Sequence, residues 1–124
     1  MKRILIVDDV PEIRRLVRLC TLQRYAVLEA ANAEEALATA RRERPDLIVL
    51  DLGLPGPMDG LDLLASLRRD PETAGIRVIV LSGRGLENDT LGLPIDGYLT
   101  KPFRPDKLAD AIGALLDSAN VGIR

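Results

Sequence analysis

Short apolar runs alternate with helical patterns along the whole chain, and this alternation limits the possible folds more than any other feature. The runs are rich in Ile, Val and Leu, as strands buried in a parallel sheet are. They cover residues 4–7, 47–50, 78–81 and, more weakly, 98–100, and a further strand is plausible at residues 26–29. Because strands that alternate with helices form parallel sheets joined by right-handed crossovers, we predict a doubly wound α/β fold with helices on both faces.

Helix signals separate these strands. The first helix begins near Pro11, a residue favoured in the first turn, and the second follows Asn32, which forms a capping pair with Glu35. A third helix is predicted over about residues 60–69, and the last begins after Pro105. The regular succession of strand and helix therefore extends to the end of the chain.

The segment from residue 83 to residue 97 departs from this regularity. It is rich in glycine, contains Pro94 and has no amphipathic stripe. Since glycine and proline both disfavour a helix interior, we expect the fourth helix, between the last two strands, to be short or irregular.

Composition limits the functional classes. The 124 residues, of which 47% are apolar, suit one domain over residues 1–124, and a net charge of −2 provides no basic excess to attract nucleic acid. No apolar run is long enough for a membrane span or a signal peptide, so we expect a cytoplasmic protein. Because the chain has no histidine, zinc sites, catalytic triads and phosphohistidine chemistry that need its own histidines are excluded. The lone Cys20 is interpreted as a buried thiol.

Polar side chains follow the strands at the edge of the sheet where their carboxyl ends meet. Asp8 and Asp9 follow the first strand, Asp51 follows the third, Ser82 the fourth, and Lys101-Pro102 the fifth. Ligands of open α/β sheets bind outside this edge. We therefore predict a functional site that these residues share.

Three carboxylates gathered at one edge imply a divalent cation, because without one they would repel each other and one would hold a proton. Mg²⁺ prefers oxygen ligands and is commonly bound by one or two carboxylates together with a phosphate. An aspartate can form an aspartyl-phosphate, with Lys101 neutralising oxygen charge and the Ser82 hydroxyl donating to the phosphoryl group. The residues thus favour phosphoryl transfer to Asp51.

Each residue alone also has a structural interpretation. Asp8 and Asp9 could cap the first helix, and Asp51 could be a turn residue. Lys101 is more often a solvated charge and Pro102 an ordinary trans proline, while Ser82 alone is weak evidence. Their coincidence at one sheet edge favours the functional interpretation.

The sequence resembles the receiver domain of two-component response regulators over nearly its whole length. The similar motifs are ILIVDD at residues 4–9, PDLIVLD at 45–51, Asp59-Gly60, and YLTKPF at 98–103. The resemblance implies a flavodoxin-like five-stranded sheet in the order 2-1-3-4-5. It also implies a bacterial signalling phosphoprotein and a phosphoacceptor at Asp51.

The resemblance assigns roles to the remaining site residues. Asp9 would bind Mg²⁺ directly, Asp8 largely through water, and Gly53 through its backbone carbonyl. Ser82 and Lys101 would contact the phosphoryl group.

Two further assignments come from the resemblance. The Lys101-Pro102 peptide would be cis. Tyr98 would be an aromatic switch that turns inward when Ser82 moves toward the phosphate, although the residue could also be an ordinary core aromatic.

The sequence departs from the family pattern in three places. Pro57 lengthens the loop that follows Asp51, and the stretch from Ser82 to Lys101 is shorter than is typical. Arg24 stands where a glycine commonly ends the first helix. Dimerisation or output contacts that use the fourth helix are therefore not carried over from the family.

The leading hypothesis is a switch that takes its phosphoryl group from a sensor histidine kinase or a histidine phosphotransfer protein. It would release the group by self-dephosphorylation, in which Arg84 flanks the approach of water. The output would be a downstream protein target, a relay or a homodimer. The start at Met1 favours a natural N-terminus, whereas residues 118–124 give no indication of the C-terminus.

Two alternatives stay open. One is a receiver-like interaction module that works without phosphorylation. The other is a small aspartate-nucleophile phosphatase, against which Gly53 counts, because such enzymes place a second aspartate at that position.

Overall fold

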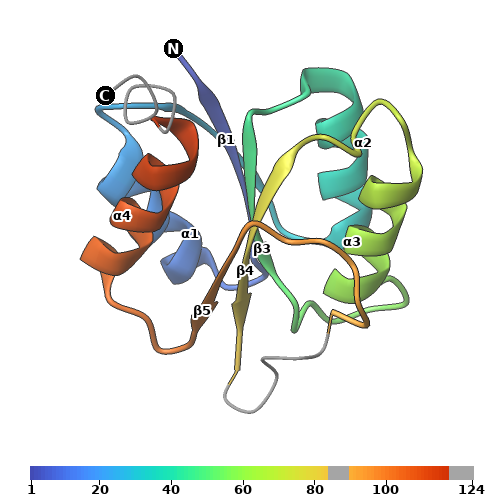
Figure 1. Ribbon diagram of the computed structural model, residues 1–124. Helices are drawn as coiled ribbons and strands as arrows, with labels where there is room; N and C mark the ends of the chain where they lie inside the picture. Colours follow the sequence, from blue (N-terminus) through green and yellow to red (C-terminus); the bar gives the residue numbers. More distant parts are fainter. Residues whose placement is uncertain (84–89, 118–124) are drawn as a thin grey trace.

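The computed structural model describes residues 1–83 and 90–117 and contains a parallel sheet between two layers of helices (Figure 1). The five strands lie in the order β2-β1-β3-β4-β5, and every neighbouring pair is parallel. The predicted fold class and strand order are therefore confirmed. The strands are β1 (Arg3–Val7), β2 (Ala26–Ala30), β3 (Leu47–Asp51), β4 (Arg77–Ser82) and β5 (Gly97–Thr100).

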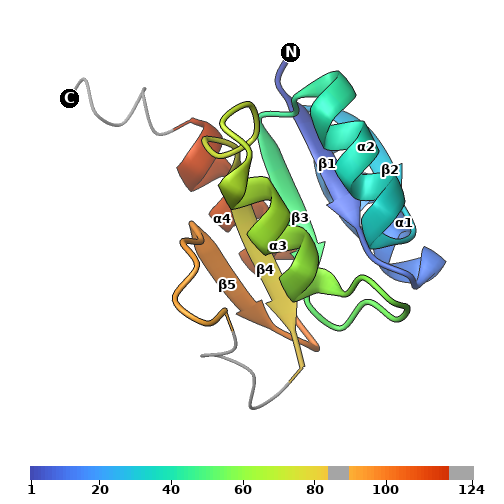
Figure 2. The same cartoon turned by 90° about the vertical axis from the view of Figure 1, so that its right-hand side faces the viewer.

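Helices cover both faces of the sheet (Figure 2). Helices α1 (Pro11–Thr21) and α4 (Pro105–Leu116) pack on one face, and helices α2 (Ala33–Glu43) and α3 (Gly60–Arg69) pack on the other. None of the helices in the described part of the chain is both long and apolar enough to cross a membrane.

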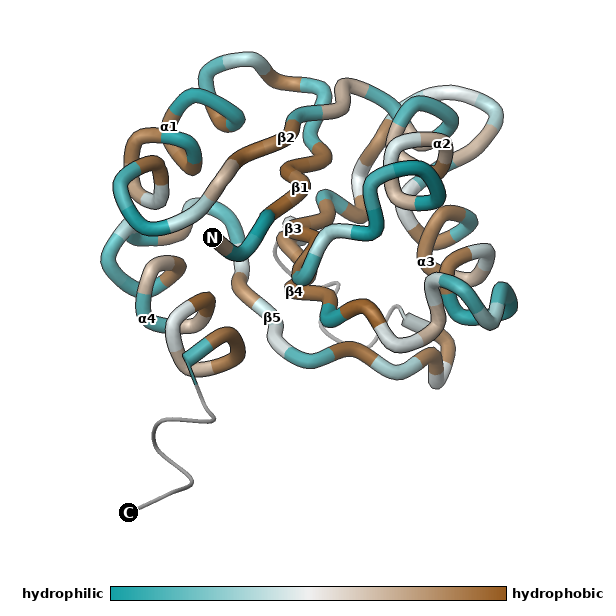
Figure 3. The backbone as a smooth tube through the Cα atoms, turned by 90° about the horizontal axis from the view of Figure 1, so that it is seen from above, coloured by the Kyte–Doolittle hydropathy of each residue, from teal (hydrophilic) through white to brown (hydrophobic). Residues whose placement is uncertain are grey.

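The central strand β3 contributes to both hydrophobic cores. All five of its residues are buried. Ile48 and Leu50 pack in the core beneath α2 and α3, whereas Leu47 and Val49 pack in the core beneath α1 and α4. Burial on both faces explains why the strand is apolar over residues 47–50, and the tube at β3 is brown in Figure 3.

The helix starts follow the predicted signals. Asn32 is the N-cap of α2, and its side chain accepts a hydrogen bond from the backbone N–H of Glu35 at 2.8 Å. Asp59 and Asp62 form a reciprocal capping box at the start of α3, which fixes the end of the loop after β3.

The connection between β4 and β5 lacks a helix wherever the structure describes it. Residues 90–92 form a turn in which Leu91 and Gly92 have positive φ angles of 51° and 79°. Residues 93–96 then lead into β5 without helical structure, and residues 84–89 lie outside the described part of the chain. Residues 90–96 therefore contain no part of the expected fourth helix, and the rest of that prediction lies outside the described residues.

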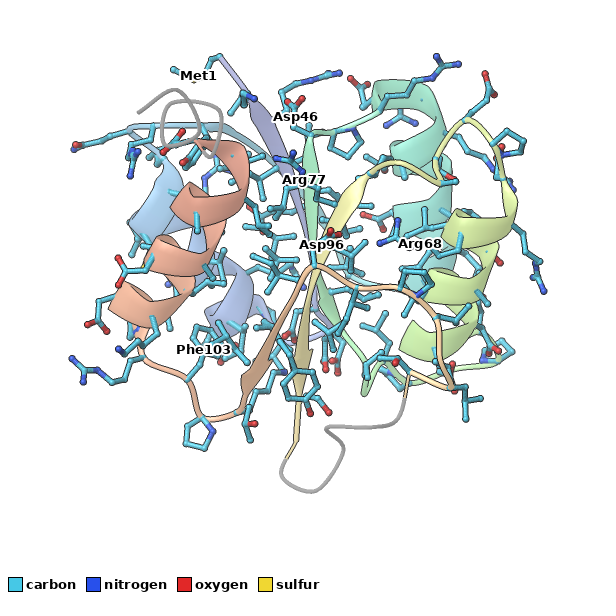
Figure 4. All side chains as sticks on the ribbon, in the orientation of Figure 1. Met1, Asp46, Arg68, Arg77, Asp96 and Phe103 are labelled. Carbon is cyan, nitrogen blue, oxygen red and sulfur yellow. The ribbon has the colours of Figure 1, made fainter. Side chains whose placement is uncertain are left out.

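One arginine of α3 holds this connection in place. Arg68 donates from Nε to the carbonyl oxygen of Pro94 at 2.9 Å and from Nη1 to the carbonyl oxygens of Ala74 at 2.8 Å and Ile76 at 2.7 Å. Its Nη2 lies 3.5 Å from Oδ2 of Asp96. Figure 4 labels both charged residues and shows Arg68 extending from α3. A single side chain thus ties the approach to β4 and the approach to β5 to the same helix.

Cys20 differs from its predicted environment. The side chain lies on α1 and is half-buried rather than fully buried. The partial burial raises the pKa of the thiol above its usual value, which disfavours the reactive thiolate.

Candidate functional site

The carboxyl edge of the sheet brings three aspartates together. Asp8 and Asp9 follow β1, and Asp51 ends the neighbouring strand β3. Each offers a carboxylate oxygen, and these oxygens all lie within 4.8 Å of one another. Asp8 and Asp51 are buried and Asp9 is exposed, so the cluster is open to solvent on the side of Asp9.

Lys101 supplies a positive charge to this cluster. Its Nζ lies 2.9 Å from Oδ2 of Asp8 and 3.2 Å from Oδ2 of Asp51. The pairing of β4 with β5 positions the lysine, because the backbone N–H of Lys101 donates to the carbonyl of Ser82 at 2.7 Å. One ammonium group therefore bridges the two buried carboxylates.

Backbone groups hold the other oxygen of each buried carboxylate. Oδ1 of Asp51 accepts from the backbone N–H of Gly53 at 2.9 Å, and Oδ1 of Asp8 accepts from the backbone N–H of Val10 at 2.9 Å. Asp9 has no such contact among the described residues. Its carboxylate is thus the one that is free to turn toward a ligand.

The pKa shifts reflect this mixture of burial and charge. Burial raises the pKa of Asp51, and the charge of Asp8 adds to the increase, although the Gly53 N–H and Lys101 oppose it. Burial lowers the pKa of Lys101, but the hydrogen bonds and charges of Asp8 and Asp51 outweigh this effect and raise it. The site therefore resists a full negative charge at Asp51 unless further positive charge is added.

The donor set fits Mg²⁺. The ligands on offer are carboxylate oxygens, which this ion prefers, and they are close enough to share one ion. Hydrogen bonds already hold the carboxylates of Asp8 and Asp51 in place. The carboxylate of Asp9 can move to meet the ion. A divalent cation here would relieve the repulsion that a single lysine leaves uncompensated.

Ser82 is the last residue of β4, the strand next to β3, and Tyr98 lies on β5. Ser82 is fully buried, and its hydroxyl donates to the carbonyl oxygen of Gly83 at 3.3 Å. The Tyr98 ring packs against the core beneath α2 and α3, where its hydroxyl is buried without a hydrogen-bond partner among the described residues. The Lys101-Pro102 peptide bond is cis.

Gly60 closes the loop behind Asp51. A Cβ atom at this position would lie 2.4 Å from the carbonyl oxygen of Asp51 and 2.5 Å from the Cα atom of Leu52. The first turn of α3 therefore packs directly on the backbone that carries Asp51. The Asp59-Gly60 motif is visible in the sequence, but the sequence does not show which backbone the glycine contacts.

Arg14 of α1 also belongs to the site. The side chain is only 18% exposed, and its Nη1 donates to the backbone carbonyl oxygen of Asp8 at 2.7 Å. Arg84, which the sequence placed near the approach of water, lies outside the described residues.

An apolar cavity of about 390 Å³ adjoins the cluster. It lies between α1 and the loop after β5, and its lining consists of Ile13, Leu16, Lys101, Pro102 and Phe103. The side chain of Lys101 thus borders both the cavity and the carboxylates.

Comparison with known families identifies a match over most of the chain. A model described as the response regulator receiver domain matches residues 4–113. The phosphate regulon transcriptional regulatory protein PhoB of Pseudomonas aeruginosa is 39% identical over 98% of this chain and 54% of its own length. Protein PilH of the same species is 37% identical over 94% of this chain and 98% of its own length. The chain therefore spans about half of PhoB and nearly all of PilH.

Solved structures give the same match. A CheY-like response regulator receiver domain protein from Methanospirillum hungatei superposes with a TM-score of 0.85 at 33% identity, with 98% of each chain covered. The chemotaxis response regulator CheY4 of Vibrio cholerae superposes with a TM-score of 0.83 at 30% identity over 94% of this chain.

Proposed function

The chain belongs to the response regulator receiver domain family, and from this premise we propose that Asp51 is its phosphoacceptor. Members of the family act in phosphorylation-dependent two-component signalling as switches rather than as enzymes. The observation that carries the assignment of Asp51 is the bridge that Lys101 makes between Asp8 and Asp51 at the carboxyl edge of the sheet. The domain is proposed to comprise residues 1–124.

Asp51 attacks the phosphorus atom of a phosphohistidine on the donor protein. As its carboxylate oxygen forms the new P–O bond, the P–N bond of the donor breaks, and its electron pair stays on the donor imidazole. The 124 residues contain no histidine, so the donor histidine lies outside them. Sensor histidine kinases and histidine phosphotransfer proteins are the partners that provide one in such systems.

The surrounding groups stabilise the charge that is transferred. Lys101 already lies 3.2 Å from Asp51 and can follow the added negative charge onto the phosphoryl oxygens. Asp8, Asp9, Asp51 and the carbonyl of Gly53 would hold Mg²⁺, which when bound neutralises charge on the phosphoryl group. The Gly53 N–H keeps one Asp51 oxygen fixed, and the other, which Lys101 contacts, is the one that reacts.

Ser82 and Tyr98 are proposed to report the state of Asp51 to the surface. The Ser82 hydroxyl bonds to the carbonyl of Gly83 in the structure, a weak contact that it can exchange for a phosphoryl oxygen. Such a move changes the packing beside Tyr98, which pairs with β4 two positions before Ser82. The altered face of β4, β5 and α4 would then bind a downstream target or a second copy of the chain.

The cavity beside Lys101 is proposed as the docking place of the phosphoryl donor. Ile13, Leu16 and Phe103 present apolar surface next to the site, and transfer requires the donor histidine to reach Asp51 while water is excluded. Arg18 on the same helix is exposed enough to add electrostatic attraction to an acidic partner surface.

Incubation with acetyl phosphate tests the proposal without a cognate kinase. Intact-protein mass spectrometry should show one added phosphoryl group in the wild type with Mg²⁺, and none with EDTA or in Asp51→Asn. Absence of the adduct under all conditions would favour an interaction module that works without phosphorylation. Steady release of phosphate from unrelated phosphomonoesters would favour the phosphatase.

A further inference from the structure

Arg14 joins the acidic cluster to the edge strand of the sheet. Its Nη1 donates to the backbone carbonyl oxygen of Asp8 at 2.7 Å, and its Nε donates to Oε1 of Glu29 on β2 at 3.1 Å. Arg18 contacts the other oxygen of Glu29 at 3.1 Å. Glu29 therefore fixes the orientation of the Arg14 guanidinium, and Arg18 in turn holds the Glu29 carboxylate.

Asp8 is fixed at four atoms. Its backbone N–H donates to Ala30 at 3.2 Å, and its backbone carbonyl accepts from Arg14. Its carboxylate oxygens accept from the Val10 N–H and from Lys101 Nζ, both at 2.9 Å. The Arg14 contact is the one among these four that sets the peptide plane between Asp8 and Asp9, because the Asp8 carbonyl belongs to that peptide group.

The start of α1 gives this contact particular weight. The N-cap residue Val10 has no side-chain oxygen to accept from the first turn of the helix, so the turn that carries Asp8 and Asp9 lacks the usual capping bond. Asp9 itself makes no fixing contact among the described residues. The direction in which Asp9 presents its carboxylate thus depends on the peptide plane that Arg14 holds.

We propose that Arg14, oriented by Glu29, is a positioning residue for Mg²⁺ binding, because it fixes the peptide between Asp8 and Asp9 and so presents both carboxylates to one ion. Arg14 does not touch the ion. The inference rests on the proposed function, since it presupposes that the aspartate cluster binds Mg²⁺.

Simple electrostatics predicts the opposite effect for the loss of Arg14. A positive charge close to the cluster repels Mg²⁺, so its removal would tighten binding if charge alone mattered. Positioning predicts weaker binding, because the freed turn must be ordered when the ion binds. The sign of the change in affinity therefore separates the two effects.

Isothermal titration of the metal-free protein with MgCl₂ tests the proposal. We expect Arg14→Gln to raise the Kd for Mg²⁺ by about tenfold, the lower end of the range for residues that orient metal ligands. Arg15→Gln is the matched control: it removes the same charge from the next position of α1, where the side chain is exposed and has no bonded partner among the described residues. Its Kd should stay the same or fall slightly.

Glu29→Gln is the second variant to be titrated with MgCl₂. It leaves Arg14 in place but removes the charge that orients it, so we expect a smaller loss of Mg²⁺ affinity. The double variant Arg14→Gln/Glu29→Gln should bind no more weakly than Arg14→Gln, because Glu29 acts through Arg14. Circular dichroism of each variant verifies folding, and Arg14→Lys, which can reach the Asp8 carbonyl but not both partners, should recover part of the affinity.

The outcomes separate the two proposals. If the wild type binds Mg²⁺ and Arg14→Gln binds it equally or more tightly, the positioning role of Arg14 is wrong and the metal site stands. If the folded wild type does not bind Mg²⁺, both the metal site and the role of Arg14 are overturned.

Discussion

The ammonium nitrogen of Lys101 lies 3.2 Å from a carboxylate oxygen of Asp51. The lysine follows β5 and the aspartate ends β3, so the sheet must be complete before the two can meet. The same nitrogen lies 2.9 Å from Asp8, which leaves one cation facing two buried carboxylates. The site therefore keeps an excess of negative charge in the folded protein, and that excess is what makes it receptive to a metal ion and a phosphoryl donor.

Replacement of Lys101 should separate metal binding from phosphoryl transfer. Lys101→Met removes a competing cation, so Mg²⁺ should bind as tightly as in the wild type or more tightly. Phosphorylation by acetyl phosphate should slow by about two orders of magnitude, as for loss of one preorganised charge-stabilising donor. Stopped phosphorylation reactions analysed by mass spectrometry give the rate, and the exposed Lys107→Met serves as control. An unchanged rate in Lys101→Met would remove the lysine from the mechanism.

The stability of the metal-free protein should depend on the charge of Asp51. Burial raises the pKa of this carboxyl group in the folded state. A group with a raised folded pKa contributes stability that is complete below the unfolded pKa and is lost as pH rises through the folded value. From pH about 4, the ordinary aspartate value, up through the raised pKa, the wild type should lose stability relative to Asp51→Asn.

Thermal unfolding in EDTA at a series of pH values measures this difference. The melting temperature of Asp51→Asn minus that of the wild type should increase with pH across this window and then stay constant. Asp110→Asn controls for the loss of an exposed carboxylate on α4. A difference that shrinks as pH rises would contradict the assigned direction of the Asp51 pKa shift.

Gly60→Ala should strongly destabilise the protein. The added Cβ would lie 2.4 Å from the carbonyl oxygen of Asp51, a backbone atom that can move only together with β3. We expect a loss of about 3 kcal/mol in unfolding free energy, as for severe overpacking. Chemical denaturation measures it. Gly75→Ala is the matched control, because a Cβ there meets nothing within 4 Å, and a comparable loss in that variant would make the steric account of Gly60 wrong.

Arg68→Ala should loosen the connection between β4 and β5. The substitution leaves the carbonyls of Pro94, Ala74 and Ile76 without their charged donor. We expect a loss of about 2–3 kcal/mol and faster amide exchange at residues 93–97. Hydrogen-exchange mass spectrometry measures both the loss of stability and the local exchange rates. Arg69→Ala, at an exposed neighbouring position, should change neither quantity. Unchanged protection of residues 93–97 in Arg68→Ala would show that the Arg68 hydrogen bonds are dispensable.

The sequence predicts the polar edge of the sheet because strand periodicity locates the strand ends. Once residues 47–50 are recognised as a buried parallel strand, Asp51 must lie at its carboxyl end, and the same reasoning places Asp8 and Lys101 beside it. Each site residue is located by two local signals, an apolar run and the polar residue that follows it. The strand order is the one piece of long-range information that the prediction also uses.

Contacts between elements that are distant in the chain carry no such local signal. Arg14 stands on a helix that also carries Arg15 and Arg18, and only the packing of α1 against β2 shows that one of these arginines reaches the Asp8 carbonyl. The clamp made by Arg68 depends in the same way on where the β4–β5 connection passes α3. Side-chain direction across an interface decides these roles, and a sequence pattern does not specify it.

Chemical location of the phosphoryl group tests the central claim most directly. Protein treated with acetyl phosphate and Mg²⁺ is reduced with sodium borohydride, which converts an aspartyl-phosphate to homoserine, and is then mapped by peptide mass spectrometry. We predict homoserine at residue 51 only, and none when EDTA replaces Mg²⁺ during the incubation with acetyl phosphate. Homoserine at Asp8 or Asp9 in place of residue 51, or its absence in protein that binds Mg²⁺, would contradict the assignment of Asp51 as the phosphoacceptor.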